Sequence, residues 1–157
     1  MDKDKFFMLE ALKQAKKAFD EDEVPVGSVL VHDNKVVARG YNQVEKLKDA
    51  TAHAEMLCLT AGSMHFNNWR LKDTTLYTTL EPCIMCAGAL ILARVKRLVW
   101  SSKDLRVGAN GSFIDVFEKD HPIHSLDITT GVLKDISSDL MTKFFQKIRK
   151  KKLLDNV

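Results

Sequence analysis

The sequence has few of the residues that break, loosen or cross-link a chain. Its 157 residues include only 7 glycines, 3 prolines and 3 cysteines. So little glycine and proline argues against a long linker or a low-complexity segment. A small, odd number of cysteines argues against the disulfide framework of a small secreted protein.

Long apolar runs are also missing. The longest, residues 83–93, is far too short to span a bilayer, and the charged start MDKDKFF lacks the apolar segment of a signal peptide. We therefore expect a protein of the reducing cytoplasm with no membrane segment. With this length and 45% apolar residues, the chain can form one domain over residues 1–157 with a sizeable core.

Acidic residues are missing from one stretch near the C-terminus. Residues 143–152, KFFQKIRKKK, contain six of the 24 basic residues and no acidic one, which leaves 18 basic residues against 21 acidic ones elsewhere. Lysine and arginine favour the C-terminal end of a helix through the helix dipole, so a solvated helix end is one interpretation. This density of charge also fits a surface for an anionic partner, of which nucleic acid is the commonest.

Hydrophobic periodicity predicts an alternation of helices and strands. The predicted elements are a helix over 8–19, strands over 28–32 and 35–41, a helix over 51–61, a strand over 74–80, a helix from Pro82 to about 94, strands over 97–101 and 126–132, and a basic helix over about 136–152. Such an alternation implies a sheet covered by helices on both faces.

The sequence also offers signals for the ends of these helices. Thr51 and Asp135 are the expected N-caps of the second and last helices, and Gly62 is expected to end the second. Pro82 suits the first turn of the third helix, where its missing N–H costs nothing.

Two of the three cysteines, Cys83 and Cys86, lie three positions apart at the head of the apolar run. This spacing brings both thiols to one face of a helical turn, and the positive end of the helix favours the thiolates that zinc prefers. The alternatives are inert core cysteines, a redox pair, or half of a structural four-cysteine zinc site. The last needs a second pair, whereas Cys58 is the only other cysteine and is expected to pack in the core. The redox alternative stays open on the pair alone.

The stretch TAHAE, residues 51–55, places His53 and Glu55 two positions apart at the start of another helix. Both side chains of a first turn can reach past the helix end toward one point. His53 can then be a third metal ligand, with Glu55 beside the metal rather than bound to it. Three protein ligands leave a fourth position open, which is typical of a catalytic zinc site. Alone, this stretch also fits a solvated helix start.

Together, HAE at 53–55 and PCIMC at 82–86 resemble the H-x-E…P-C-x-x-C signature of the zinc-dependent nucleoside and nucleobase deaminases. Segments over nearly the whole chain resemble, more narrowly, the bacterial tRNA-specific adenosine deaminases of the cytidine and deoxycytidylate deaminase superfamily. They are EVPVGSVLV (23–31), GYN (40–42), TAHAE (51–55), NWRL (68–71), TLYTTLEPCIMCAGA (75–89), VGANGS (107–112) and FFQKIRKK (144–151).

The resemblance implies a three-layer α/β/α fold with a five-stranded mixed sheet, usually as a homodimer. It implies one zinc ion per chain, held by His53, Cys83 and Cys86. The implied reaction is hydrolysis of adenosine to inosine at the wobble position of a tRNA anticodon, with zinc activating a water and Glu55 carrying protons.

The resemblance also implies contacts to the substrate. They are Val26 as a pocket wall, Asn42 at the purine edge, the backbone N–H of Ala54, Asp104 beside the flipped nucleotide, Phe145 stacking near the anticodon, and Arg149 at phosphates. Core packing for Val26, a turn for Asn42, a solvated loop for Asp104 and helix packing for Phe145 are the simpler interpretations.

Two rival functions and one histidine pair complete the expectations. A small-molecule cytosine or guanine deaminase would use the same zinc chemistry but would not need the basic C-terminal stretch. A zinc-stabilised RNA-binding module would have no use for Glu55. His121 and His124 have a passable metal spacing, but no thiol lies near them in the sequence and we expect them at the surface.

Overall fold

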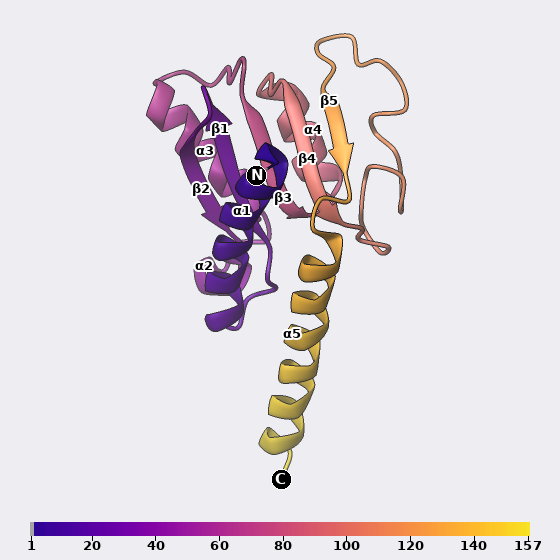
Figure 1. Ribbon diagram of the computed structural model, residues 1–157. Helices are drawn as coiled ribbons and strands as arrows, with labels where there is room; N and C mark the ends of the chain where they lie inside the picture. Colours follow the sequence, from indigo (N-terminus) through magenta and orange to yellow (C-terminus); the bar gives the residue numbers. More distant parts are fainter. Residues whose placement is uncertain (1) are drawn as a thin grey trace.

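The computed structural model describes residues 2–157 (Figure 1). Its elements are α1 (Lys3–Asp20), β1 (Gly27–His32), β2 (Lys35–Tyr41), α2 (Val44–Leu47), α3 (Ala54–Phe66), β3 (Thr75–Leu80), α4 (Ile84–Leu92), β4 (Arg97–Ser102), β5 (Asp127–Thr130) and α5 (Lys134–Asp155). Every predicted helix and strand is present, and the short helix α2 is an addition. Within residues 2–157, none of the helices combines the length and the apolar composition that a bilayer crossing requires.

The five strands form one mixed sheet in the order β2-β1-β3-β4-β5. β1 runs antiparallel to both β2 and β3, whereas β3, β4 and β5 run parallel. Helix α4 makes the crossover from β3 to β4, as parallel neighbours require. The carboxyl ends of β2, β3, β4 and β5 therefore lie at one edge of the sheet.

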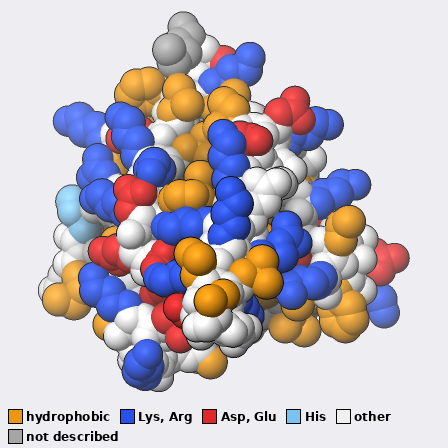
Figure 2. Space-filling view, turned by 90° about the horizontal axis from the view of Figure 1, so that it is seen from below, with side chains coloured by type: hydrophobic (Ala, Val, Ile, Leu, Met, Phe, Trp, Pro, Cys, Tyr) orange, Lys and Arg blue, Asp and Glu red, His pale blue; other side chains and the backbone are white. Residues whose placement is uncertain are grey.

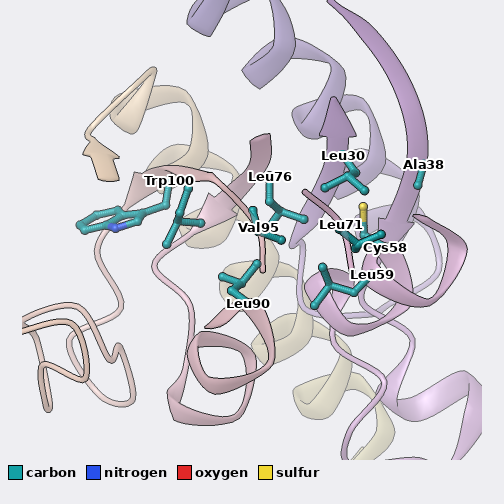
Figure 3. Close-up of a cluster of buried hydrophobic side chains, with 10 residues drawn as sticks. Leu30, Ala38, Cys58, Leu59, Leu71, Leu76, Leu90, Val95 and Trp100 are labelled. Atoms are coloured by element: carbon teal, nitrogen blue, oxygen red, sulfur yellow. The ribbon is translucent and has the colours of Figure 1, made fainter. Parts of the chain in front are cut away.

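Helices cover both faces of the sheet. Along β1 and β4 the side chains alternate, so that Leu30 and Leu98 join a core cluster with α3 and α4, while Val29 and Val99 join a second cluster with α1. Figure 3 shows the first cluster, in which Cys58 of α3 is fully buried, as expected. The predicted three-layer α/β/α fold with a five-stranded mixed sheet is confirmed.

Helix α5 follows β5 and projects beyond the edge of the sheet (Figure 1). Phe144 and Ser137 of the helix are buried against the rest of the chain. Asp22, in the turn after α1, adds two ion pairs, with its carboxylate 2.9 Å from Nζ of Lys147 and 2.6 Å from Nζ of Lys151. The hydrogen bond from Lys151, and then that from Lys147, lowers the pKa of Asp22 to about 2. Both ion pairs are therefore present at neutral pH.

The predicted ends of α3 are wrong for local reasons. Thr51 does not cap the helix, because its N–H and Oγ1 donate to Asp49 Oδ1 and the helix begins only after His53, its N-cap residue. Gly62 does not end the helix. A Cβ at this position would lie 2.5 Å from Cδ2 of Leu30, so the glycine instead lets α3 pack closely on β1.

Two further predictions about helix starts are wrong. Pro82 precedes α4 instead of joining its first turn, because Cys83 is the N-cap residue. Asp135 lies in the first turn of α5 without capping it, since the cap residue is Leu133 in the left-handed conformation (φ 55°). The helix itself extends a few residues beyond the predicted range at each end.

Candidate active site

The site forms where two helices begin. Helices α3 and α4 start with N-cap residues of extended backbone, His53 (ψ 153°) and Cys83 (ψ 175°), and neither side chain makes a capping hydrogen bond. Both side chains are therefore available to other partners. Cys86 lies one turn into α4, so that its thiol stands on the same side as that of Cys83.

The three side chains converge on one point. His53 Nδ1 lies 3.5 Å from Sγ of Cys83 and 3.5 Å from Sγ of Cys86, and all three atoms lie within 4.8 Å of one another. A tetrahedral zinc ion, with Zn–S of about 2.3 Å and Zn–N of about 2.0–2.1 Å, requires an N···S distance of about 3.5 Å. Both N···S distances thus match those of a tetrahedral zinc site. Three ligands leave a fourth position for water or substrate.

Protons are shared unequally among these groups. The hydrogen bond from Cys86, assisted by one from His53, lowers the pKa of Cys83 to about 4. The hydrogen bond that the Cys86 thiol makes to the Cys83 thiolate raises the pKa of Cys86. The hydrogen bond that His53 makes to Cys83 raises the pKa of His53. A divalent cation favours the deprotonated form of all three groups, so metal binding releases protons.

Glu55 is the acidic group of the site. It follows His53 by two residues, and only 4% of its surface is exposed. Burial, the largest effect, raises the pKa of its carboxyl group above the usual range, while the neighbouring Cys86 acts in the opposite direction. A carboxylate with a raised pKa is a better proton acceptor than an ordinary one, which favours a role in general acid–base catalysis.

A cleft of about 520 Å³ opens above these residues, a size within the usual range for small-molecule sites. His53, Glu55 and Cys83 lie along it. Its other walls come from residues within 22–26 between α1 and β1, within 42–45 after β2, at 80–81 at the end of β3, within 104–107 after β4, and on one face of α5.

Four of the six predicted substrate contacts line this cleft, namely Val26, Asn42, Ala54 and Asp104. Asn42 is 7% exposed, and its Nδ2 donates to the carbonyl oxygen of Val24 at 3.2 Å. Its Oδ1 has no hydrogen-bond partner within the described chain. An unpaired buried acceptor is unfavourable, which favours a ligand donor at this position.

The other two predicted contacts, Phe145 and Arg149, lie on α5 outside the cleft lining. Phe145 is 38% exposed. Helix α5 turns Phe144, Ile148 and Lys152 toward the cleft instead, because residues four apart share a helix face. This spacing of four in the sequence could have identified Phe144, Ile148 and Lys152 as residues of one helix face. Contact of Phe145 and Arg149 with RNA stays a prediction.

The histidine pair after β4 takes no part in the metal cluster. Both histidines have intermediate exposure, and Nε2 of His124 donates to the carbonyl oxygen of Val95 at 2.6 Å. His121 is partly exposed and its Nδ1 accepts from the N–H of Ile123 at 3.1 Å. Within residues 2–157, His53, Cys83 and Cys86 make up the one cluster with metal-ligand geometry.

Two buried carboxylates near the cleft were missed in the sequence. Glu23 is 1% exposed and accepts from the N–H groups of Glu45 at 2.9 Å and Lys46 at 3.0 Å, which fixes α2 beside the cleft. Glu81 is 2% exposed and lies between the end of β3 and Cys83. Nothing in the neighbouring sequence distinguishes Glu23 and Glu81 from acidic residues at the protein surface.

Comparison with known proteins agrees with this geometry. Residues 1–102 match the family described as the cytidine and deoxycytidylate deaminase zinc-binding region. A tRNA-specific adenosine deaminase of Bacillus subtilis is 40% identical over 152 residues, covering 97% of this chain and 94% of the relative. The chain belongs to the tRNA-specific adenosine deaminase family. Zinc is the metal of this family, and the predicted cofactor is confirmed.

Further members of the family extend the comparison. The chloroplastic tRNA(adenine(34)) deaminase of Arabidopsis thaliana is 53% identical over 159 residues, which cover 91% of this chain, although the chain spans only 12% of that relative's length. A solved structure from studies of A-to-I editing by tRNA:A34 deaminases matches with a TM-score of 0.82 and 38% identity, covering 86% of this chain and 98% of that chain. The resemblance inferred from the sequence motifs is confirmed.

We expect the purified protein to hold about one zinc ion per chain. His53→Ala, Cys83→Ala and Cys86→Ala should each lose most of it, because each removes one of only three ligands. Cys58→Ala is the matched control and should keep its zinc, since Cys58 packs in the core. Elemental analysis of the folded variants measures the metal. Full zinc content in a ligand variant would contradict the assignment.

Proposed function

We propose that this chain hydrolyses adenosine to inosine at the wobble position of a tRNA anticodon, as a single deaminase domain over residues 1–157. The observation that carries the proposal is the convergence of His53, Cys83 and Cys86 beside the buried Glu55, in a cleft that also borders a basic helix. The names of the relatives support a tRNA adenine as substrate. Three free cysteines suit the reducing cytoplasm, where we place the activity.

The reaction adds water to C6 of adenine and expels ammonia. Zinc, when bound, supplies water that is acidic enough to react near neutral pH. Glu55 moves the protons: its carboxylate takes one from the water, passes it to N1 of the base, and later helps to protonate the departing amino group. These steps follow one another, so one carboxyl group is sufficient. Burial of Glu55 suits this work because it raises the pKa of the proton carrier.

Other residues of the cleft orient the base. The unpaired Oδ1 of Asn42 can accept a hydrogen bond from the purine edge. The backbone N–H of Ala54 belongs to the first turn of α3, where such groups have no partner within the helix. Val26 adds an apolar wall. The base must first leave its stack, at a cost of roughly a few kcal/mol that is lowest in a loop.

Replacement of Glu55 tests the chemistry. Glu55→Gln should keep zinc and tRNA binding but lower the rate by at least ~10²–10⁴-fold, because it removes the proton carrier without removing a ligand. The measurement is inosine formation at the wobble nucleotide of bulk tRNA, with free adenine, guanine and cytosine as comparison substrates.

The outcomes separate the rival functions. Faster turnover of a free base than of tRNA by the unmodified protein would favour a small-molecule deaminase. Loss of zinc from Glu55→Gln would identify Glu55 as a ligand. Inosine formation at the normal rate in the variant would contradict the proposed role.

We further propose that α5 binds the RNA backbone. Figure 2 views the molecule from below and shows many Lys and Arg side chains on this face, with fewer acidic ones among them. Lys147 and Lys151 pair with Asp22. Arg149, Lys150 and Lys152 have no such ion pair within the described chain, so these three are the better candidates for phosphate contacts.

The salt dependence of tRNA binding tests this surface. Each phosphate contact contributes roughly −0.7 to −0.9 to the slope of log K against log salt. Replacing Arg149, Lys150 and Lys152 by Gln should therefore weaken binding and flatten the slope by about two to three units. A matched control replaces Lys35, the first residue of β2, and Lys72, which lies before β3, because both lie toward the opposite edge of the sheet. Equal slopes in both variants would exclude α5 as the phosphate-binding surface.

We also propose a homodimer formed through α4. Ile84 and Leu92 are 56% and 57% exposed, and a Cβ on Gly88 between them would meet no atom within 4 Å. These positions are four apart and so share one face of the helix. An exposed apolar face with a small central residue allows a second copy to approach closely.

Sedimentation at micromolar concentration tests the dimer. The unmodified protein should sediment as a dimer, and Leu92→Glu should shift it to a monomer, because a charge would be buried in the interface. Leu153→Glu is the control, since Leu153 is 69% exposed near the end of α5. A monomeric unmodified protein would refute the proposal.

A further inference from the structure

The connection from β4 to β5 is long and lacks regular structure. It runs over residues 103–126 with no helix and no named strand, and it must return along the sheet because β4 and β5 are parallel (Figure 1). Connections of this length without secondary structure are uncommon in compact domains and are usually functional or disordered. This one begins beside the cleft, where Asp104, Arg106 and Val107 form a wall.

A single buried carboxylate holds the first part of this connection. Glu81 Oε1 accepts from the N–H of Asp104 at 3.3 Å and from the hydroxyl of Ser112. Its Oε2 accepts from the N–H groups of Asn110 at 3.0 Å and Ser112 at 3.3 Å. Four donors from one loop thus converge on one side chain, and hydrogen bonds to an ionised acceptor are among the strong ones.

The same loop is fixed to the segment that carries a metal ligand. Gly108 forms an isolated β-bridge with Cys83, and the N–H of Ala109 donates to the carbonyl oxygen of Pro82 at 2.8 Å. A Cβ on Gly108 would lie 2.3 Å from the Glu81 carboxylate. Only glycine therefore allows the loop to lie this close to the carboxylate.

We propose that Glu81 is a positioning residue. It fixes the 104–112 loop against segment 82–83, which carries the metal ligand Cys83, so that the loop forms the substrate-facing wall of the cleft. The role rests on the proposed function, because the substrate it serves is the flipped adenosine. Glu81 also lines the cleft, but both of its carboxylate oxygens already accept hydrogen bonds from the loop. It acts through Asp104, Arg106 and Val107, whose positions depend on the loop it holds.

The first test is hydrogen–deuterium exchange, which needs no substrate. Glu81→Gln keeps the size of the side chain but replaces one acceptor by a donor, so that some loop N–H groups lose their partner. Amides of residues 104–112 should exchange roughly 10- to 100-fold faster. Amides of α3 and α4, and zinc content, should stay as in the unmodified protein.

The second test is steady-state kinetics of the zinc-loaded fraction. Because the wall contacts the substrate and not the reacting atoms, KM for tRNA should rise about tenfold or more, with kcat changed much less. Ser112→Ala removes one of the four donors and should give a smaller change of the same kind, in a variant that folds even if Glu81→Gln does not. Glu118→Gln, an exposed acid of the same connection, is the matched control.

The outcomes distinguish this inference from the proposed function. Unchanged exchange of 104–112 in both Glu81→Gln and Ser112→Ala would overturn the role of Glu81. Amide exchange could instead rise equally throughout the chain, with a normal KM in the folded fraction. Glu81 would then be a purely structural residue, and the proposed positioning role would also be overturned. If the unmodified protein forms no inosine, the proposed function fails, while the exchange data alone decide whether Glu81 holds the loop.

Discussion

The N-termini of two helices, α3 and α4, face one point, and this requirement constrains how most of the chain packs. His53 and Cys83 serve as the first residues of α3 and α4, and their ligand atoms lie 3.5 Å apart only because both helices pack on the same face of the sheet. Close packing makes this possible. A Cβ on Gly40 would lie 2.4 Å from the carbonyl oxygen of Ala54, so β2 approaches the start of α3 at a distance that a larger residue would prevent. The metal geometry therefore depends on a glycine that never touches the metal.

Three buried carboxylates near the cleft illustrate how surroundings decide what an acid does. Glu23 accepts two backbone N–H groups and Glu81 accepts three together with a hydroxyl, so both hold neighbouring segments. Glu55 receives no such set of donors, and burial raises the pKa of its carboxyl group. The carboxylates of Glu23 and Glu81 are engaged by backbone donors, whereas that of Glu55 lies beside the thiol of Cys86 and faces the cleft. All three acids are buried, and the proposed catalytic role falls to Glu55 because its carboxyl group is not engaged by such a set of backbone donors.

Much of this arrangement was predictable from the sequence, and the errors have physical causes. The combination of HAE at 53–55 with PCIMC at 82–86 predicted the metal cluster through its resemblance to a known signature, whereas the cysteine pair alone had left a redox pair open. The helix starts were misjudged because the capping positions carry metal ligands in place of the usual capping side chains. The role of Glu81 could not be predicted, since its partners lie 23 to 31 positions away in an irregular loop. Long-range contacts of this kind leave no periodic signal.

The basic C-terminal helix shows why a count of charges is a poor guide to an RNA surface. Six basic residues fall within residues 143–152, but they lie on different faces of the helix and have different partners. Lys147 and Lys151, four apart, face Asp22 and fasten α5 to the end of α1. Lys143 pairs with Asp139 one turn earlier. Lys152 follows Phe144 and Ile148 along the cleft face. Three of the six basic residues are therefore already paired, and the proposed phosphate contacts fall to Arg149, Lys150 and Lys152, which have no ion pair within the described chain.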